Sequence, residues 1–174
     1  EEKGWGVAIE AIEKLKQHKQ NLLFVLIFTP TEYMRVLQNK YGSMPEYRFL
    51  SFVSNPASWL ANSDCFILPS QFPESLPYAI IEALGVGTPV IASPVAEIPK
   101  MLESEQGLAG ALIECDAMGR PSADRLAYHL NRLATEPDLR QAWSKNALLA
   151  FQKFSMENCG KRYKFAFDAL INAK

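Results

Sequence analysis

The chain has 174 residues, of which 48% are hydrophobic and 21% charged, and its formal net charge is −1. This length suits one domain with a real core, and the composition is that of a globular protein rather than a disordered one. The charge balance lacks the basic excess of nucleic-acid-binding proteins, so we expect no nucleic-acid partner. Three widely spaced cysteines without a CxxC pair indicate reduced, mostly buried thiols in a cytoplasmic protein and no structural metal site.

No signal peptide is recognisable at the start, and no apolar run reaches the length of a membrane-spanning helix. The first residues run almost directly into a helical pattern, without a preceding strand. We therefore expect the chain to be part of a longer protein.

Strands and helices are predicted to alternate along the first two thirds of the chain. Apolar residues recur at helical spacing over residues 6–18, which predicts an amphipathic helix. Residues 22–28 form a continuous apolar run, typical of a parallel strand buried on both faces. Further strands are expected at 48–53, 65–68, 90–93 and 111–113, and further helices at 31–41, 56–62, 77–86 and 98–103. Gly87 and Pro89 mark a turn, since glycine suits a helix C-terminus and proline cannot continue the helix.

From residue 123 onward the pattern is helical only. Ser155 is expected to cap the last helix, whose apolar face would consist of Tyr163, Phe167, Leu170 and Ile171. Trp59, Trp143, Phe165 and Phe167 are interpreted as packing residues, and His18 and His129 as surface histidines. The alternation predicts an α/β, Rossmann-like, doubly wound and mostly parallel sheet over about residues 1–121. A helical tail follows over about 122–174, within a single domain of residues 1–174.

In such sheets, ligands bind beyond the carboxyl ends of the strands. The longest segment there, 69–77, contains Glu74 and leads into a helix on which Glu82 is the only charge. We expect that helix to be buried, which makes its carboxylate expensive unless it is bonded. Glu82 either caps or pairs within the protein, or accepts hydrogen bonds from a ligand diol. Glu74 either favours the positive helix end or faces ligand hydroxyls, beside helix amides that suit phosphate.

These residues resemble a known family. The stretch PSQFPESLPYAIIEALGVGTPVIAS over residues 69–93 is similar to the donor motif of retaining GT-B glycosyltransferases of family 4, the glycosyl transferases group 1. Its signature is two glutamates separated by seven residues, here Glu74 and Glu82. Lys3-Gly4 before the first helix is similar to the start of the family's C-terminal, nucleotide-sugar-binding domain.

The resemblance implies roles for individual residues. Lys3 and Glu74 would be catalytic, with Lys3 neutralising the departing diphosphate and Glu74 contacting the donor sugar; an ordinary solvated lysine is the alternative for Lys3. Glu82 would contact the ribose. The remaining donor-binding residues would be Ser75, Leu76, Pro77 and Tyr78 around the diphosphate, and Phe52, Val53 and Ser54 near the base.

The implied reaction is transfer of a sugar from a nucleotide diphosphate donor to an acceptor hydroxyl, with retention at the anomeric carbon, as in polysaccharide biosynthesis. No Asp-x-Asp motif occurs, so we expect no metal and no cofactor beyond the donor. The alternatives are a GT-B epimerase or phosphorylase-like domain and a non-catalytic assembly domain. A dinucleotide-dependent oxidoreductase is disfavoured because no GxGxxG follows a strand.

The partners implied are a nucleotide sugar and an N-terminal acceptor domain that this chain lacks. The full-length enzyme would be cytoplasmic, with a peripheral membrane contact as one option for the basic residues near the end. The chain departs from the family's usual pattern where paired glycines are replaced by Ala96-Glu97 and where the donor loop carries Ser75 and Pro77. The family's usual first strand, in the middle of the sheet, also has no counterpart.

Overall fold

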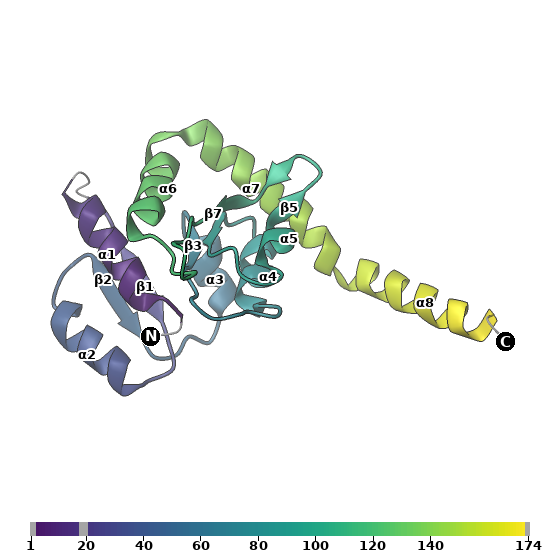
Figure 1. The fold of residues 1–174 in the computed structure, drawn as a ribbon, viewed down its shortest axis with the longest axis horizontal. Helices are drawn as coiled ribbons and strands as arrows, with labels where there is room; N and C mark the ends of the chain where they lie inside the picture. The colour runs from purple at the N-terminus through teal and green to yellow at the C-terminus, as the bar shows by residue number, and fades with distance from the viewer. Residues whose placement is uncertain (1–2, 18–20, 173–174) are drawn as a thin grey trace.

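A computed structural model describes residues 3–17 and 21–172 (Figure 1). The predicted alternation is confirmed, with most boundaries shifted by one to three residues. The helices of the α/β part are α1 (Trp5–Lys16), α2 (Glu32–Tyr41), α3 (Pro56–Ala61), α4 (Tyr78–Gly85) and α5 (Ile98–Leu102). The parallel strands are β1 (Phe24–Ile27), β2 (Tyr47–Leu50), β3 (Phe66–Leu68), β4 (Val90–Ala92) and β7 (Gly110–Leu112). His18 lies outside the described residues.

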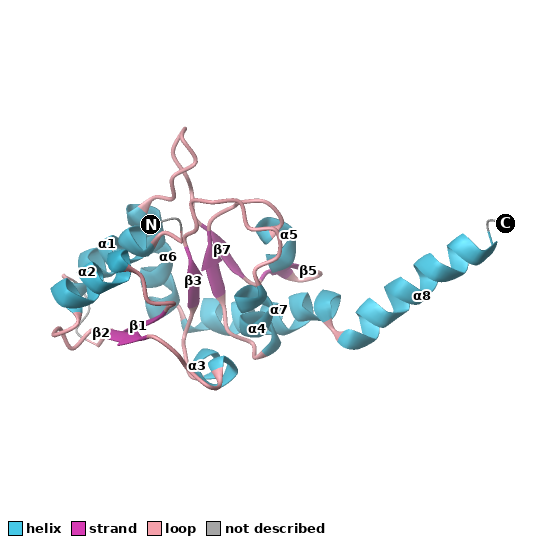
Figure 2. Cartoon of the chain, turned by 90° about the horizontal axis from the view of Figure 1, so that it is seen from below, coloured by secondary structure: helices cyan, strands magenta, loops and turns pink. Residues whose placement is uncertain are grey.

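The strands form two separate parallel sheets rather than one. β1 pairs with β2, and β3, β4 and β7 pair in that order. Figure 2 shows β1 and β2 to one side of the sheet that contains β3 and β7. A short antiparallel hairpin of β5 (Glu103–Ser104) and β6 (Gly107–Leu108) was not predicted from the sequence. The α/β class is therefore confirmed. The described strands do not form the single continuous sheet that was expected, because β1 and β3 do not pair.

The prediction that residues 22–28 form a strand buried on both faces is wrong. Within β1 only Leu26 is fully buried, and Ile27 is 37% exposed. A strand becomes buried on both faces when layers cover it and neighbours flank it. Among the described strands β1 pairs with β2 alone, so its apolar side chains are only partly covered.

A helical layer joins the two sheets on one face. Phe24 of β1 and Ile67 of β3 pack against the same apolar cluster, to which α1 contributes Ala8 and Ala11. α1 also packs along α6 (Ala123–Thr135), whose Leu126 is fully buried in this cluster. The sheets are thus held together by side-chain packing rather than by a continuous hydrogen-bond ladder.

Two helices of the tail complete the core, and a third leaves it. α7 (Pro137–Phe151) packs on α4 and buries Trp143, as predicted. After a 3-10 turn (Gln152–Phe154), α8 (Met156–Asn172) projects away from the body (Figure 1), and the Ser155 hydroxyl accepts the Asn158 amide as the expected cap.

The prediction that Phe165 and Phe167 pack is wrong, because they are 76% and 61% exposed on this projecting helix. Within the described ranges, none of the helices is both long and apolar enough to cross a bilayer. Trp59 is also 40% exposed. The three cysteines are free and partly buried.

Candidate functional site

The loop that joins β3 to α4 is anchored by a serine. Ser70 is fully buried just after β3, and its hydroxyl donates to Glu74 Oε1 at 3.0 Å. The Phe72 amide donates to the same hydroxyl oxygen at 3.4 Å. The loop therefore folds back on the end of β3, and the Glu74 side chain is held in a position where 13% of it is exposed.

The start of the chain reaches this loop. The Lys3 ammonium bonds to Glu74 Oε1 at 2.5 Å, so the two residues predicted to be catalytic lie together. The next residue, Gly4, has a φ of 73°, and a Cβ there would lie 1.8 Å from the Pro69 carbonyl oxygen. Only glycine combines this left-handed backbone with so close an approach. The backbone contact between Gly4 and Pro69 thus brings Lys3 to the carboxyl end of β3.

The N-terminus of α4 opens beside Glu74. Pro77 is its N-cap and provides no side-chain cap, and the Ile80 amide donates to the Pro77 carbonyl at 3.0 Å. Ser75, Leu76 and Tyr78 are exposed, and Pro77 is partly exposed. An uncapped helix N-terminus in contact with solvent attracts anions through its amides and dipole. The segment predicted to bind the diphosphate is therefore accessible to solvent. Its helix N-terminus also has the partial positive charge that attracts an anion.

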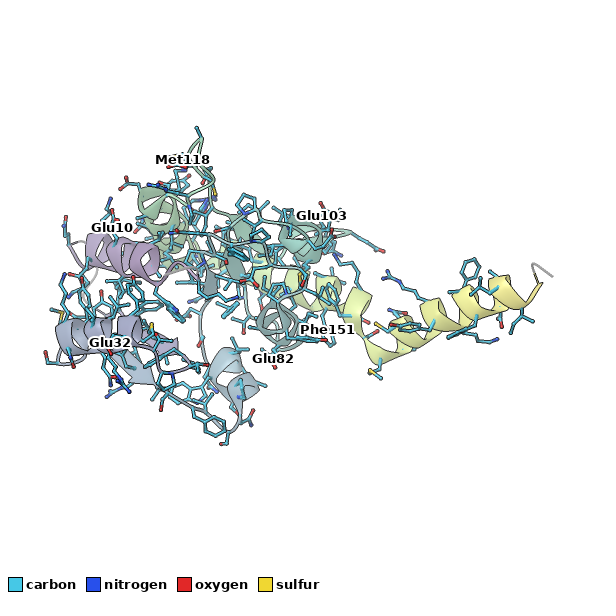
Figure 3. All side chains as sticks on the ribbon, turned by 60° about the horizontal axis from the view of Figure 1, so that its bottom comes forward. Glu10, Glu32, Glu82, Glu103, Met118 and Phe151 are labelled. Carbon is cyan, nitrogen blue, oxygen red and sulfur yellow. The ribbon has the colours of Figure 1, made fainter. Side chains whose placement is uncertain are left out.

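The prediction that Glu82 lies on a buried helix is wrong. α4 packs into the core through Ile80, Ala83 and Leu84, which are fully buried. Glu82 is exposed, and it shares its helix face with exposed Tyr78, four residues earlier. Figure 3 shows Glu82 on α4 at the edge of the molecule. That face of α4 is in contact with solvent, so the carboxylate needs no partner within the protein. A role of Glu82 in ligand binding therefore rests on its accessibility to a ligand and not on its burial.

The three residues expected near a base lie in the loop between β2 and α3. Phe52 is 82% exposed and Ser54 is exposed, while Val53 is partly buried. The strand predicted over 48–53 ends at Leu50. Core packing is therefore excluded for Phe52. The hydrogen bonds and the ion pair of Glu74 among the described residues join it to Lys3 and Ser70 rather than to this loop.

Two features of the site were not predicted. Ser70 belongs to the segment 69–77 at the carboxyl ends of the strands, but nothing in the sequence marked its hydroxyl as the partner of Glu74. The close contact of Gly4 with Pro69 could not be read from the sequence, because the two residues lie far apart along the chain. Within residues 3–17 and 21–172, no group of three histidine, cysteine or acidic side chains is placed to hold a metal ion.

A hollow of about 500 Å³ lies away from Glu74. It is lined by residues that include Asp64, Gly87 and Arg140, and the last bonds to Asp64 at 2.9 Å. Asp64 precedes β3 and Gly87 precedes β4, so this hollow lies at the amino ends of the strands. Ligands of open α/β sheets bind at the opposite edge. The site is therefore placed at Glu74 rather than in this hollow.

Solved structures share this fold, among them that of a glycosyltransferase. Alr3699/HepE of Anabaena in complex with UDP superposes with a TM-score of 0.79 at 19% identity, over 97% of this chain and 46% of that chain. A glycosyltransferase from Rickettsia africae ESF-5 superposes with a TM-score of 0.80 at 16% identity, over 100% of this chain and 46% of that chain. The architecture is that of an α/β domain of the GT-B type.

Residues 1–149 match the model of the family described as Glycosyl transferases group 1, and the chain belongs to this family. WcaL of Escherichia coli strain K12 is provisionally named as a colanic acid biosynthesis glycosyltransferase. It is 34% identical to this chain over 142 residues, which cover 73% of this chain and 33% of that protein. The amylovoran biosynthesis glycosyltransferase AmsK of Erwinia amylovora is 31% identical over 112 residues, 59% of this chain and 28% of that protein. The chain thus spans about a third of the length of these curated relatives.

Proposed function

We propose that this chain is the donor-binding part of an enzyme that transfers a sugar from a nucleotide diphosphate sugar to an acceptor hydroxyl, with retention at the anomeric carbon. The observation that carries the proposal is the pair formed by Lys3 and Glu74 beside the open N-terminus of α4. The cation and the helix amides suit the diphosphate of such a donor, and the carboxylate suits the hydroxyls of its sugar. Structures of a relative of the same fold contain UDP and UDP-glucose, which supports a uridine nucleotide as the first ligand to test.

The carboxylate and the cation would act on different parts of the donor. Glu74 has acceptor capacity only, so it would receive hydrogen bonds from sugar hydroxyls. Lys3 and the amides of Ser75, Leu76 and Tyr78 would stabilise the charge that grows on the departing diphosphate. Pro77 has no amide hydrogen and would contribute its fixed backbone instead. Glu82, exposed on the same side of α4 as Tyr78, would receive the ribose hydroxyls.

We further propose that the acceptor site belongs to a part of the enzyme outside this chain. The chain corresponds to 46% of the HepE structure and 33% of WcaL, so these relatives are much longer. The projecting α8 offers that missing part an apolar face that includes Tyr163, Phe167 and Leu170. Four of its charges are already paired within the helix, Lys161 with Glu157 and Lys164 with Asp168. With Arg162 as the fifth charge, the net charge of α8 is only +1, which favours a protein surface over an anionic membrane.

Binding and turnover test the proposal separately. NMR titration of the chain with UDP-glucose, GDP-mannose and UDP should shift amide signals of loop 69–77 and the start of α4. The chain alone should release no UDP from UDP-glucose, because it lacks the acceptor site. Transfer by the longer protein should give a product with the anomeric configuration of the donor, measured by its proton coupling constant. Failure of both the chain and the longer protein to bind any nucleotide sugar would favour a non-catalytic assembly domain.

A further inference from the structure

We propose that Ser70 is the positioning residue that orients the Glu74 carboxylate so that its Oε2 atom faces the donor sugar. This role rests on the proposed function of the site. Ser70 is fully buried at the end of β3, and Glu74 lies four residues further along the loop. The hydroxyl thus joins the rigid edge of the sheet to the side chain that would contact the sugar.

The hydrogen bonds at Ser70 determine where its single proton lies. The acceptors within reach among the described residues include Glu74 Oε1 at 3.0 Å and the Phe72 carbonyl oxygen at 3.2 Å. The carboxylate is nearer and charged, which makes it the stronger acceptor. The Phe72 amide donates to the Ser70 oxygen at 3.4 Å, so this oxygen also accepts a hydrogen bond. Ser70 therefore donates to Glu74.

Both protein donors use the same oxygen of the carboxylate. Lys3 and Ser70 bond to Oε1, and none of the hydrogen bonds among the described residues reaches Oε2. A carboxylate held through one oxygen can offer the other to a ligand hydroxyl in a fixed direction. The arrangement assigns Oε1 to the protein and Oε2 to the ligand.

The two donors differ in how firmly they are held. The Lys3 side chain is 54% exposed on a flexible stem, whereas Ser70 is buried and short. A bound diphosphate would attract the Lys3 ammonium, and Glu74 would then lose this partner. Ser70 would remain bonded to Oε1 and keep the carboxylate in place while Lys3 changes partner. Its effect should therefore be confined to the sugar and absent from the nucleotide.

The experiment compares the affinities of the chain for UDP-glucose and for UDP, measured by NMR titration. Ser70→Ala should lower the preference for UDP-glucose over UDP by about three- to tenfold, the range expected for a bond to a charged group that acts through a second residue. Its affinity for UDP should stay within about twofold of the original. Ser144→Ala is the control, because Ser144 is a partly buried serine whose hydroxyl donates to the Gly87 carbonyl at 2.7 Å, at the opposite edge of the sheet from Glu74. That variant should leave both affinities unchanged.

A double-mutant cycle separates positioning from a structural effect. If Ser70 acts through Glu74, Ser70→Ala should have no further effect on the preference once Glu74→Gln is present. Ser70→Cys, which keeps a weaker donor at the same place, should fall between serine and alanine.

The role of Ser70 alone would be overturned if Ser70→Ala lowered the affinities for UDP and for UDP-glucose equally, or if it left the preference for UDP-glucose over UDP undiminished. Failure of the original chain to bind UDP-glucose, GDP-mannose and UDP would instead count against the proposed function itself, and the role of Ser70 would fall with it.

Discussion

Lys3 and Glu74, 71 residues apart in the sequence, form an ion pair in which Lys3 Nζ lies 2.5 Å from Glu74 Oε1. The pair stands where the first described residues of the chain meet the carboxyl end of β3. The lysine side chain is about half exposed, so the pair itself should contribute only about 0–1 kcal/mol to folding. Its importance should therefore appear in ligand binding rather than in stability.

Lys3→Met should weaken the binding of UDP and of UDP-glucose by a similar factor of about ten or more, because it removes a charge-assisted bond to the diphosphate that both ligands carry. The melting temperature should change little. NMR titration measures the two affinities. Lys14→Met is the control, since Lys14 also lies near the start of the chain and pairs with Asp124 away from the site. Equal effects of both variants would show that Lys3 acts only through general charge.

Gly4→Ala should destabilise the fold by more than the about 1–2 kcal/mol expected for left-handed backbone alone, because the new methyl group would collide with the Pro69 carbonyl. Urea denaturation measures the free energy of unfolding. Gly119→Ala is a matched control, as Gly119 has a φ of 75° and no heavy atom within 4 Å of its added Cβ. Similar losses for both variants would contradict the close contact between Gly4 and Pro69.

Ala96→Gly should stabilise the protein by up to about 1 kcal/mol. Ala96 has a φ of 46°, a left-handed conformation that costs alanine more than glycine. Ala134→Gly, on the exposed side of α6, should instead destabilise by about 1 kcal/mol. Thermal unfolding of both variants checks the opposite signs.

Glu114 should make folding depend on pH in the acid range. Hydrogen bonding by Arg125, assisted by His129, lowers the pKa of Glu114 from 4.5 to about 2. Because the folded-state pKa is the lower one, this stabilisation is complete above about pH 4.5 and is lost as the pH falls towards 2. The side chain is 48% exposed, so solvent screening limits the effect to about 1 kcal/mol or less.

The variant Glu114→Gln should flatten the loss of stability between about pH 4.5 and pH 2, as followed by urea denaturation at several pH values. Glu105→Gln, at an exposed position of the β5–β6 turn, should leave the profile unchanged. The partner His129 is buried, 9% exposed, which corrects its interpretation as a surface residue. It is buried because α1 and the end of β7 cover that face of α6.

Truncation after Ser155 should leave the melting temperature within a few degrees, because the apolar side chains of α8 are mostly exposed. It should also reduce any self-association seen by sedimentation velocity. Truncation after Phe151 should be clearly more damaging. It removes Phe154, which packs on the core, and Lys153, whose ammonium donates to the Glu103 carbonyl at 2.7 Å. Equal stability of the two truncated chains would contradict this division of the tail.

Local patterns were enough to predict the order of the elements and the loop that carries the site. The turn at Gly87 is confirmed by its φ of 76°, and the Ser155 cap by its bond to the Asn158 amide. Such features depend on residues a few positions apart, so the sequence contains them directly. The family motif then directed attention to Glu74, which lies at the expected edge of the sheet.

Exposure and long-range contacts were decided by packing. Glu82 and Ile27 belong to apolar segments, yet they are exposed because none of the described elements covers their faces. The meeting of Lys3, Ser70 and Glu74 depends on how α1 packs beside β3 and on a glycine that permits backbone contact. Periodicity in the sequence indicates which residues share a face of a helix or strand. Which other element covers that face depends on how the whole chain folds. For this reason the motif could be found in the sequence, but the partners of its first glutamate emerged only in three dimensions.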